Sequence, residues 1–138
     1  MQQDVRHAVM ALVETGFEAR EDTPDSSAAR FQVRVARTFY KTSLRATEAL
    51  GTSSMGMLIM LLDLFVAHEQ GHSVSVSSLC IASGGAPTTA LRQIGQLEAR
   101  GFVTRRGDER DRRRCWIHPT PPAIDLVRSL VEEWATAL

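Results

Sequence analysis

The sequence has little lysine and little cysteine. The first shortage bears on the partners that the basic residues can bind, and the second excludes a fold held by disulfides. Of its 16 basic residues, all but Lys41 are arginine. Arginine presents a planar fork of donors that suits phosphates and guanine edges, although a GC-rich coding sequence produces the same bias. Cys80 and Cys115 stand far apart in apolar surroundings, so we expect reduced cysteines in the core and no disulfide framework.

Long apolar runs are also missing. The longest, residues 55–67, is interrupted by Asp63 and is shorter than the ~20 residues that a membrane-spanning helix needs. It predicts a buried core helix. The first ten residues, MQQDVRHAVM, lack the basic region and long apolar run of a signal peptide. We therefore expect a cytoplasmic protein with no membrane partner.

Net charge is absent too, but the charges are segregated along the chain. The 138 residues suit one domain, and basic and acidic residues number 16 each. Residues 1–27 are predicted to form an acidic helix, centred on 4–20, and a linker. Residues 28–53 hold a second helix with a basic stripe, made of Arg30, Arg34, Arg37, Lys41 and Arg45. The stripe could be a solvated face, pair with the acidic helix, or touch DNA phosphates.

From residue 54 the pattern predicts a series of short elements. In chain order these are a helix (54–70), a short strand within 72–76, a short helix capped by Ser75, a glycine turn (83–86), a helix starting at Pro87 (87–100), two strands (102–106 and 113–118) and a last helix (121–138). Two helices joined by a glycine-containing turn make a helix-turn-helix, and a hairpin adds a wing. The predicted fold class is mainly α (α+β), with a winged helix-turn-helix core over 54–120 and a two- or three-stranded wing sheet.

The helix over 87–100 carries hydrogen-bonding side chains on one face. We expect Ala90, Leu91, Ile94 and Leu97 to point inward. The outward set is Thr88, Thr89, Arg92 and Gln96, with Gln93 on the flank. Small hydroxyls, amides and one arginine are the groups that read base edges in a major groove.

The loop over 107–112 is rich in arginine. Residues 92–114 hold eight arginines and four acids. Asp108 and Asp111 alternate with Arg110, Arg112 and Arg113, and an acid beside an arginine can orient its guanidinium through a forked hydrogen bond. An arginine aimed in this way can enter the minor groove of DNA.

The string HEQGH, residues 68–72, matches the zinc-protease pattern H-E-x-x-H. That pattern needs both histidines on one helix and a third ligand close downstream. Gly71 precedes His72, and the following residues alternate as in a strand. We predict no metal, no cofactor and no catalytic residue, and therefore no enzyme. A metal site at His68 and His72 remains as an alternative.

Three stretches resemble the winged-helix core of MarR-type transcription regulators. They are LEARGFVTR (97–105), DERDRR (108–113) and the Pro-Thr pair at 119–120. The resemblance implies a recognition helix at 87–100 and wing arginines Arg110 and Arg112, with Asp108 as the orienting acid. It further implies a homodimer held by the terminal helices, 28–53 and 121–138, and a small-molecule effector. The chain departs from the family in its Pro-Thr-Pro-Pro run, its single helix after the wing and its acidic first helix.

The function predicted is therefore a transcription regulator that binds double-stranded DNA in a sequence-specific way. The predicted DNA-binding residues are Thr88, Thr89, Arg92, Gln93, Gln96, Arg105, Arg110, Arg112 and Arg113, with Asp108 and Asp111 orienting the wing. The alternative is a winged-helix protein-interaction module whose DNA surface is masked by the acidic N-terminal helix.

Overall fold

The computed structural model describes residues 27–51 and 55–138. The predicted acidic helix over 4–20 lies outside the described residues. The described elements are, in chain order, α2 (Ser27–Ala49), α3 (Met55–Glu69), β1 (Val74–Ser75), α4 (Val76–Ala82), α5 (Pro87–Ala99), β2 (Val103–Gly107), β3 (Cys115–Pro119) and α6 (Pro121–Ala137). No helix within the described part of the chain is long and apolar enough to cross a membrane.

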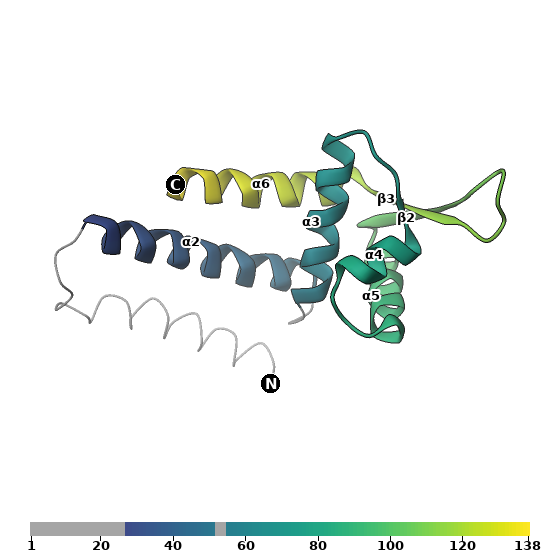
Figure 1. Ribbon diagram of the computed structural model, residues 1–138. Helices are drawn as coiled ribbons and strands as arrows, with labels where there is room; N and C mark the ends of the chain where they lie inside the picture. Colours follow the sequence, from purple (N-terminus) through teal and green to yellow (C-terminus); the bar gives the residue numbers. More distant parts are fainter. Residues whose placement is uncertain (1–26, 52–54) are drawn as a thin grey trace.

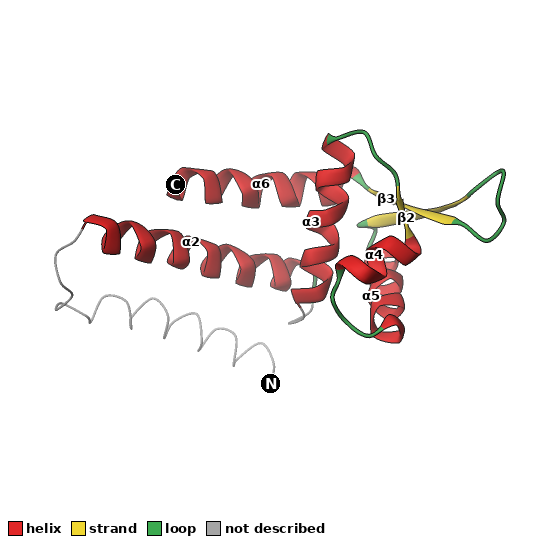
Figure 2. Cartoon of the chain, viewed as in Figure 1, coloured by secondary structure: helices red, strands yellow, loops and turns green. Residues whose placement is uncertain are grey.

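The elements divide into a helical pair and a mixed core. α2 and α6 run side by side away from α3, and the loop between β2 and β3 projects on the opposite side (Figure 1). Strand structure is confined to the side that carries α4 and α5 (Figure 2). The predicted winged helix-turn-helix is confirmed, with helices at both of its ends.

The sheet has three antiparallel strands in the order β1-β3-β2. Val74 of β1 pairs with Ile117 of β3, and Arg105 of β2 pairs with Ile117 from the other side. β1 is only two residues long, so the strand predicted within 72–76 is shorter than its alternating pattern suggested. Its pairing ties the start of α4 to the base of the wing.

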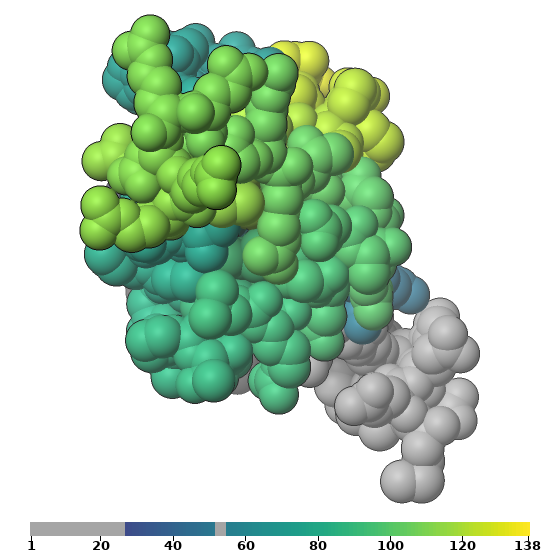
Figure 3. Space-filling view, turned by 90° about the vertical axis from the view of Figure 1, so that its right-hand side faces the viewer, coloured from purple at the N-terminus to yellow at the C-terminus, as the bar shows by residue number. Residues whose placement is uncertain are grey.

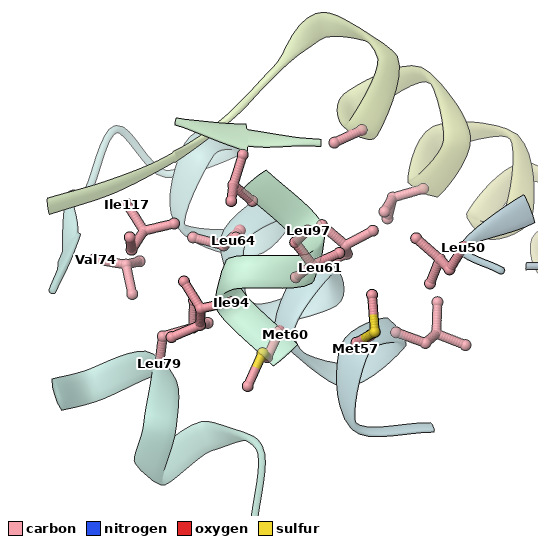
Figure 4. Packing of buried hydrophobic residues seen from close by; sticks show 14 of the residues in the cluster. Leu50, Met57, Met60, Leu61, Leu64, Val74, Leu79, Ile94, Leu97 and Ile117 are labelled. Carbon is pink, nitrogen blue, oxygen red and sulfur yellow. The ribbon is translucent and has the colours of Figure 1, made fainter. Parts of the chain in front are cut away.

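The core is formed where α3, α4, α5 and the sheet meet (Figure 4). Leu61 and Leu64 of α3 lie against Ile94 and Leu97 of α5, and all four side chains are almost completely buried. The uninterrupted apolar sequence of α3 follows from this central position, because neighbouring elements cover most of its circumference.

Three of the helices begin at residues whose local chemistry favours a helix start. The Ser75 hydroxyl accepts a hydrogen bond from the backbone N–H of Ser78 at 3.2 Å and caps α4. α5 and α6 each begin with proline at the first turn, where the missing N–H leaves no bond unmade. The predicted cap and both proline starts are confirmed.

One predicted core residue is wrong. Leu91 was expected to point inward with Ala90 and Ile94, but its side chain is 46% exposed. Leu91 lies at the edge of the apolar arc of α5, beyond the reach of α3 and α4. Ala90 and Ile94 fill the centre of that arc and are completely buried.

Candidate nucleic-acid interface

The outward face of α5 is formed by residues three and four apart. Thr88, Leu91, Arg92 and Gln96 are exposed on it, and Gly95 lies one turn beyond Leu91 and Arg92. Arg92 supplies a positive charge on this face. Glu98 stands at the edge of the face, two turns after Leu91, and its exposed carboxylate pairs with the Arg105 guanidinium at 3.3 Å. The acid at this edge is therefore neutralised by an arginine, and the face can approach an anionic partner.

Two of the predicted contact residues of α5 lie deeper than expected. Thr89 is half-buried. Gln93 is 8% exposed, and its side-chain amide lies where a Cβ on Gly56 of α3 would be. The expectation that Gln93 stands at the DNA surface is therefore wrong. The sequence signal was Gly56 itself, since a glycine inside an apolar helix leaves space for a neighbouring side chain.

Asp108 organises the wing loop through its backbone. One carboxylate oxygen accepts the N–H of Arg110 at 2.8 Å and the N–H of Asp111 at 3.2 Å. The other oxygen accepts the indole N–H of Trp116 at 3.1 Å. Asp108 was expected to orient an arginine side chain, and this is corrected: it fixes the loop on which the arginines stand.

The same contacts lower the pKa of Asp108 below its ordinary value. The largest cause is the hydrogen bond from the Arg110 N–H, and the Trp116 and Asp111 donors and the charge of Arg114 act in the same direction, against partial desolvation. Each donor favours the ionised carboxylate. The loop is therefore held by a charged, acceptor-only group at neutral pH.

Asp111 does contact an arginine. Its carboxylate accepts the backbone N–H of Arg113 at 3.0 Å and lies 3.6 Å from the Arg113 guanidinium. Arg110 and Arg112 are exposed and make no ion pair with any residue in the described ranges. The loop therefore presents two unneutralised guanidinium groups from an ordered backbone.

A hollow of about 640 Å³ lies between the wing base and the start of α4. Its lining residues are Ser75, Val76, Ser77, Arg105, Arg113, Arg114, Cys115 and Trp116. The Arg114 guanidinium stacks over the Trp116 ring at 5.8 Å. The wing, α4 and α5 share one face of the molecule (Figure 3).

The cysteines lie nearer the surface than expected. Cys80 and Cys115 are both free thiols and both half-buried. Cys80 packs against the edge of the core, and Cys115 lines the hollow. The expectation that both are core residues holds only in part.

The HEQGH string is the end of a helix. Gly71 has a positive φ of 71°, its N–H donates to the carbonyl of His68, and the N–H of His72 donates to the carbonyl of Ala67. This pair of bonds is the Schellman motif, which terminates α3 before His72. Glu69, the would-be general base, binds Arg128 of α6 at 3.0 Å. His68 and His72 therefore do not share a helical face, so the geometry that the H-E-x-x-H pattern requires is not present here.

No group of three or more potential metal ligands gathers anywhere in residues 27–51 or 55–138. The predicted absence of a metal site remains an expectation.

The basic stripe of α2 has a partner that the sequence reading did not consider. Arg34 donates to the carbonyl of Ala137 at 3.3 Å, and the Arg45 guanidinium pairs with Glu133. Both acceptors lie on α6. Part of the stripe therefore joins the two terminal helices.

Comparison with solved structures identifies the fold. A Staphylococcus aureus MepR–DNA complex superposes with a TM-score of 0.61 at 19% identity, over 74% of this chain and 80% of that chain. Overoxidised AbfR bound to DNA superposes with a TM-score of 0.55 at 17% identity, over 100% of this chain and 86% of that one. The chain has the MarR-type winged-helix fold.

Sequence comparison points to the same group. A putative transcriptional regulatory protein for the hcr operon of Thauera aromatica is 30% identical over 98 residues, 71% of this chain and 54% of that protein. The Escherichia coli K12 transcriptional repressor MprA is 32% identical over 63 residues, 46% of this chain and 36% of MprA. The chain thus spans about half the length of the first relative and about a third of the second. No family profile matches it.

Proposed function

We propose that this MarR-type chain is a transcription regulator that binds double-stranded DNA and acts by binding, without catalysis. The observation that carries the proposal is the shared surface of α5 and the wing. α5 offers a face with hydroxyl, amide and guanidinium groups whose one acid, Glu98, is paired with Arg105, and the wing adds arginines on a backbone fixed by Asp108. Such groups recognise base edges and phosphates.

In this proposal α5 lies in a major groove and the loop over 107–112 enters the adjacent minor groove. Thr88, Thr89, Arg92 and Gln96 face bases at the major groove, and Arg105, Arg110, Arg112 and Arg113 meet phosphates or the minor groove. Asp108 and Asp111 hold the loop. Gln93 is left out because it is buried against α3.

We further propose a homodimer formed through α2 and α6. No residue from 27 to 41 of α2 is buried within one protomer, although this part carries Phe31, Val33, Phe39 and Tyr40. A helix that exposes so much apolar surface gains stability from a second layer. A two-fold dimer would recognise half-sites ~34 Å apart, one turn of DNA.

Two parts of the proposal follow from the resemblance and from the DNA partner. A small-molecule effector is expected because many MarR-type regulators respond to one. A cytoplasmic location is expected because a bacterial-type regulator meets its DNA there.

The test is selection of a duplex from a randomised library, followed by titration against a scrambled duplex over a salt series. We expect selective binding whose log affinity falls linearly with log salt, with a slope of ~0.9 per phosphate contacted. A purified protein that selects no duplex at low salt would contradict the proposal. If deletion of residues 1–25 then restored binding, the masked-surface alternative would replace it.

Two arginine variants separate base reading from charge. Arg92→Ala should weaken binding to the selected duplex by ~1–3 kcal/mol and relax the preference at one base pair. Arg112→Ala should weaken binding to all duplexes and reduce the salt slope by about 1. Arg128→Ala is the matched control, because it removes one arginine on α6, where the side chain binds Glu69. Equal loss for Arg92→Ala on every sequence would show a phosphate contact only.

A further inference from the structure

Two residues on the outward face of α5 have no explanation within the fold. Leu91 exposes 46% of its side chain beside Arg92, although it is a large apolar residue. Gly95, one turn further along, occupies the middle of the helix. The charged and polar residues of α5 account for neither.

Gly95 differs from two other glycines in the chain. A Cβ added at Gly51 would collide with the Arg100 side chain, and one added at Gly56 would collide with Gln93, so these glycines make room for internal neighbours. A Cβ at Gly95 would meet nothing within 4 Å beyond its own helix backbone. Glycine in a helix interior is unfavourable relative to alanine. No neighbour among the described residues therefore requires a glycine at position 95.

Leu91 and Gly95 together shape the face for a base-pair edge. The major groove presents one apolar group, the C5-methyl of thymine. Leu91 offers apolar surface to such a methyl, next to the hydrogen-bonding Arg92. Gly95, one turn after Leu91, has no side chain. The edge of the same groove can therefore come close to the helix backbone at this position.

We propose that Leu91 is a specificity-determining residue that contacts a thymine methyl, and that Gly95 permits the close approach this contact needs. The inference rests on the proposed DNA binding and assigns to it a base preference that Arg92, Thr88 and Gln96 do not supply. The selected half-site should therefore contain a thymine whose methyl group contributes to affinity.

The first experiment replaces thymine by deoxyuridine in the selected duplex, one position at a time. At one position per half-site, wild-type affinity should fall about fourfold, the loss expected for one methyl contact. Leu91→Ala should bind the thymine duplex more weakly by about the same factor and should show no further loss with deoxyuridine. If Leu91→Ala keeps the full deoxyuridine effect, or if no position responds in the wild type, the assignment of Leu91 is overturned.

The second experiment uses Gly95→Ala. Because the site is open in the free protein, the thermal midpoint should rise by about 2 to 4 °C. Affinity for the selected duplex should nevertheless fall about tenfold or more. Ser129→Ala on α6 is the control, an exposed helix position whose change should leave DNA affinity unaltered.

The role of Gly95 and the proposed DNA binding fail in different ways. A higher midpoint with unchanged affinity, or a lower midpoint, would overturn the role of Gly95. Failure to select any duplex with the wild type would instead overturn the proposed function itself.

Discussion

The winged-helix part, from α3 to β3, and the helical pair α2–α6 are held together in different ways. In the winged part, apolar side chains from four elements converge, and Leu61, Ile94 and Leu97 are almost completely buried. In α2 the buried residues are Thr42, Ser43, Ala46 and Thr47, all in its second half. The pair adds polar and aromatic contacts to a smaller apolar contribution, since Ala46 of α2 and Val127 and Leu130 of α6 belong to the same buried cluster.

The two parts also differ in the apolar side chains that they leave exposed. Those of the winged part, among them Ile59, Ile81 and Leu91, are aliphatic and spread over α3, α4 and α5. The pair leaves Phe31, Phe39 and Tyr40 at least 39% exposed. Large exposed apolar side chains in one region mark an interaction surface. The aromatic side chains exposed on α2 are therefore suited to contact a second protomer, in agreement with the proposed homodimer.

The largest expected effect is in the winged part. Leu61→Ala should lower the free energy of unfolding by about 3–5 kcal/mol, because its side chain leaves a cavity in a closed core. Urea denaturation at fixed protein concentration measures the change. Ile59→Ala on the same helix is the control, since Ile59 is 39% exposed and should cost about 1 kcal/mol or less. Equal losses would show that this side of α3 is also covered.

A smaller effect is expected in the helical pair. The Trp134 indole N–H donates to the Thr42 hydroxyl, and its ring lies 5.3 Å from that of Phe39. Trp134→Ala should cost about 2–4 kcal/mol, and Trp134→Phe about 1 kcal/mol, because phenylalanine keeps the ring contact and loses the donor. Unfolding of both variants should depend on protein concentration if the pair forms the dimer. A phenylalanine variant as unstable as the alanine variant would assign the whole effect to the hydrogen bond.

Arg100 connects the two regions, and its removal should have a moderate effect. From the end of α5, its guanidinium donates to the carbonyls of Leu50 and Gly51 at the end of α2. Arg100→Ala should cost about 1–2 kcal/mol, because these carbonyls lose their donor. Arg106→Ala, an exposed arginine of β2, should change stability by less than about 0.5 kcal/mol. If Arg100→Ala left the free energy of unfolding unchanged, water would replace the guanidinium as donor to these carbonyls without a loss of stability.

The smallest effect is local to the wing. The lowered pKa of Asp108 means that its contribution to wing order is present above its ordinary value of 3.8 and is lost as pH falls through the lowered value. The ¹H–¹⁵N signal of the Trp116 indole should therefore titrate with a midpoint below 3.8. Asp108→Ala should abolish this titration. A midpoint at or above 3.8 would contradict the bonding described for the loop.

The sequence was sufficient where local chemistry decides structure. Pro87, Ser75 and Gly101 act through their own backbone or the next turn, so the ends of α4 and α5 could be predicted. The periodicity from residue 54 onward predicted the order of helices and strands, and the resemblance assigned the recognition helix and the wing. Together they predicted the fold class and a wing sheet of two or three strands, of which the structure has three.

The sequence was insufficient where a distant neighbour decides. Gln93 is polar, but Gly56 offers it a space that only the packed fold creates. Leu91 is apolar, but it lies at the edge of the buried arc of α5 and is 46% exposed. Asp108 stands among arginines in the sequence, yet its oxygens bind backbone N–H groups and Trp116, because a tight loop turns those donors inward. Periodicity along one helix cannot include such tertiary contacts.

The central claim is that α5 and the wing contact different grooves of the same DNA. Footprinting of the selected duplex tests it most directly, with hydroxyl radicals for the minor groove and guanine N7 methylation for the major groove. We predict that Arg112→Ala restores only hydroxyl-radical cleavage beside each half-site, and that Arg92→Ala restores only methylation within it. If both variants restored the same positions, or if the wild type protected neither groove, the assignment of α5 and the wing would be contradicted.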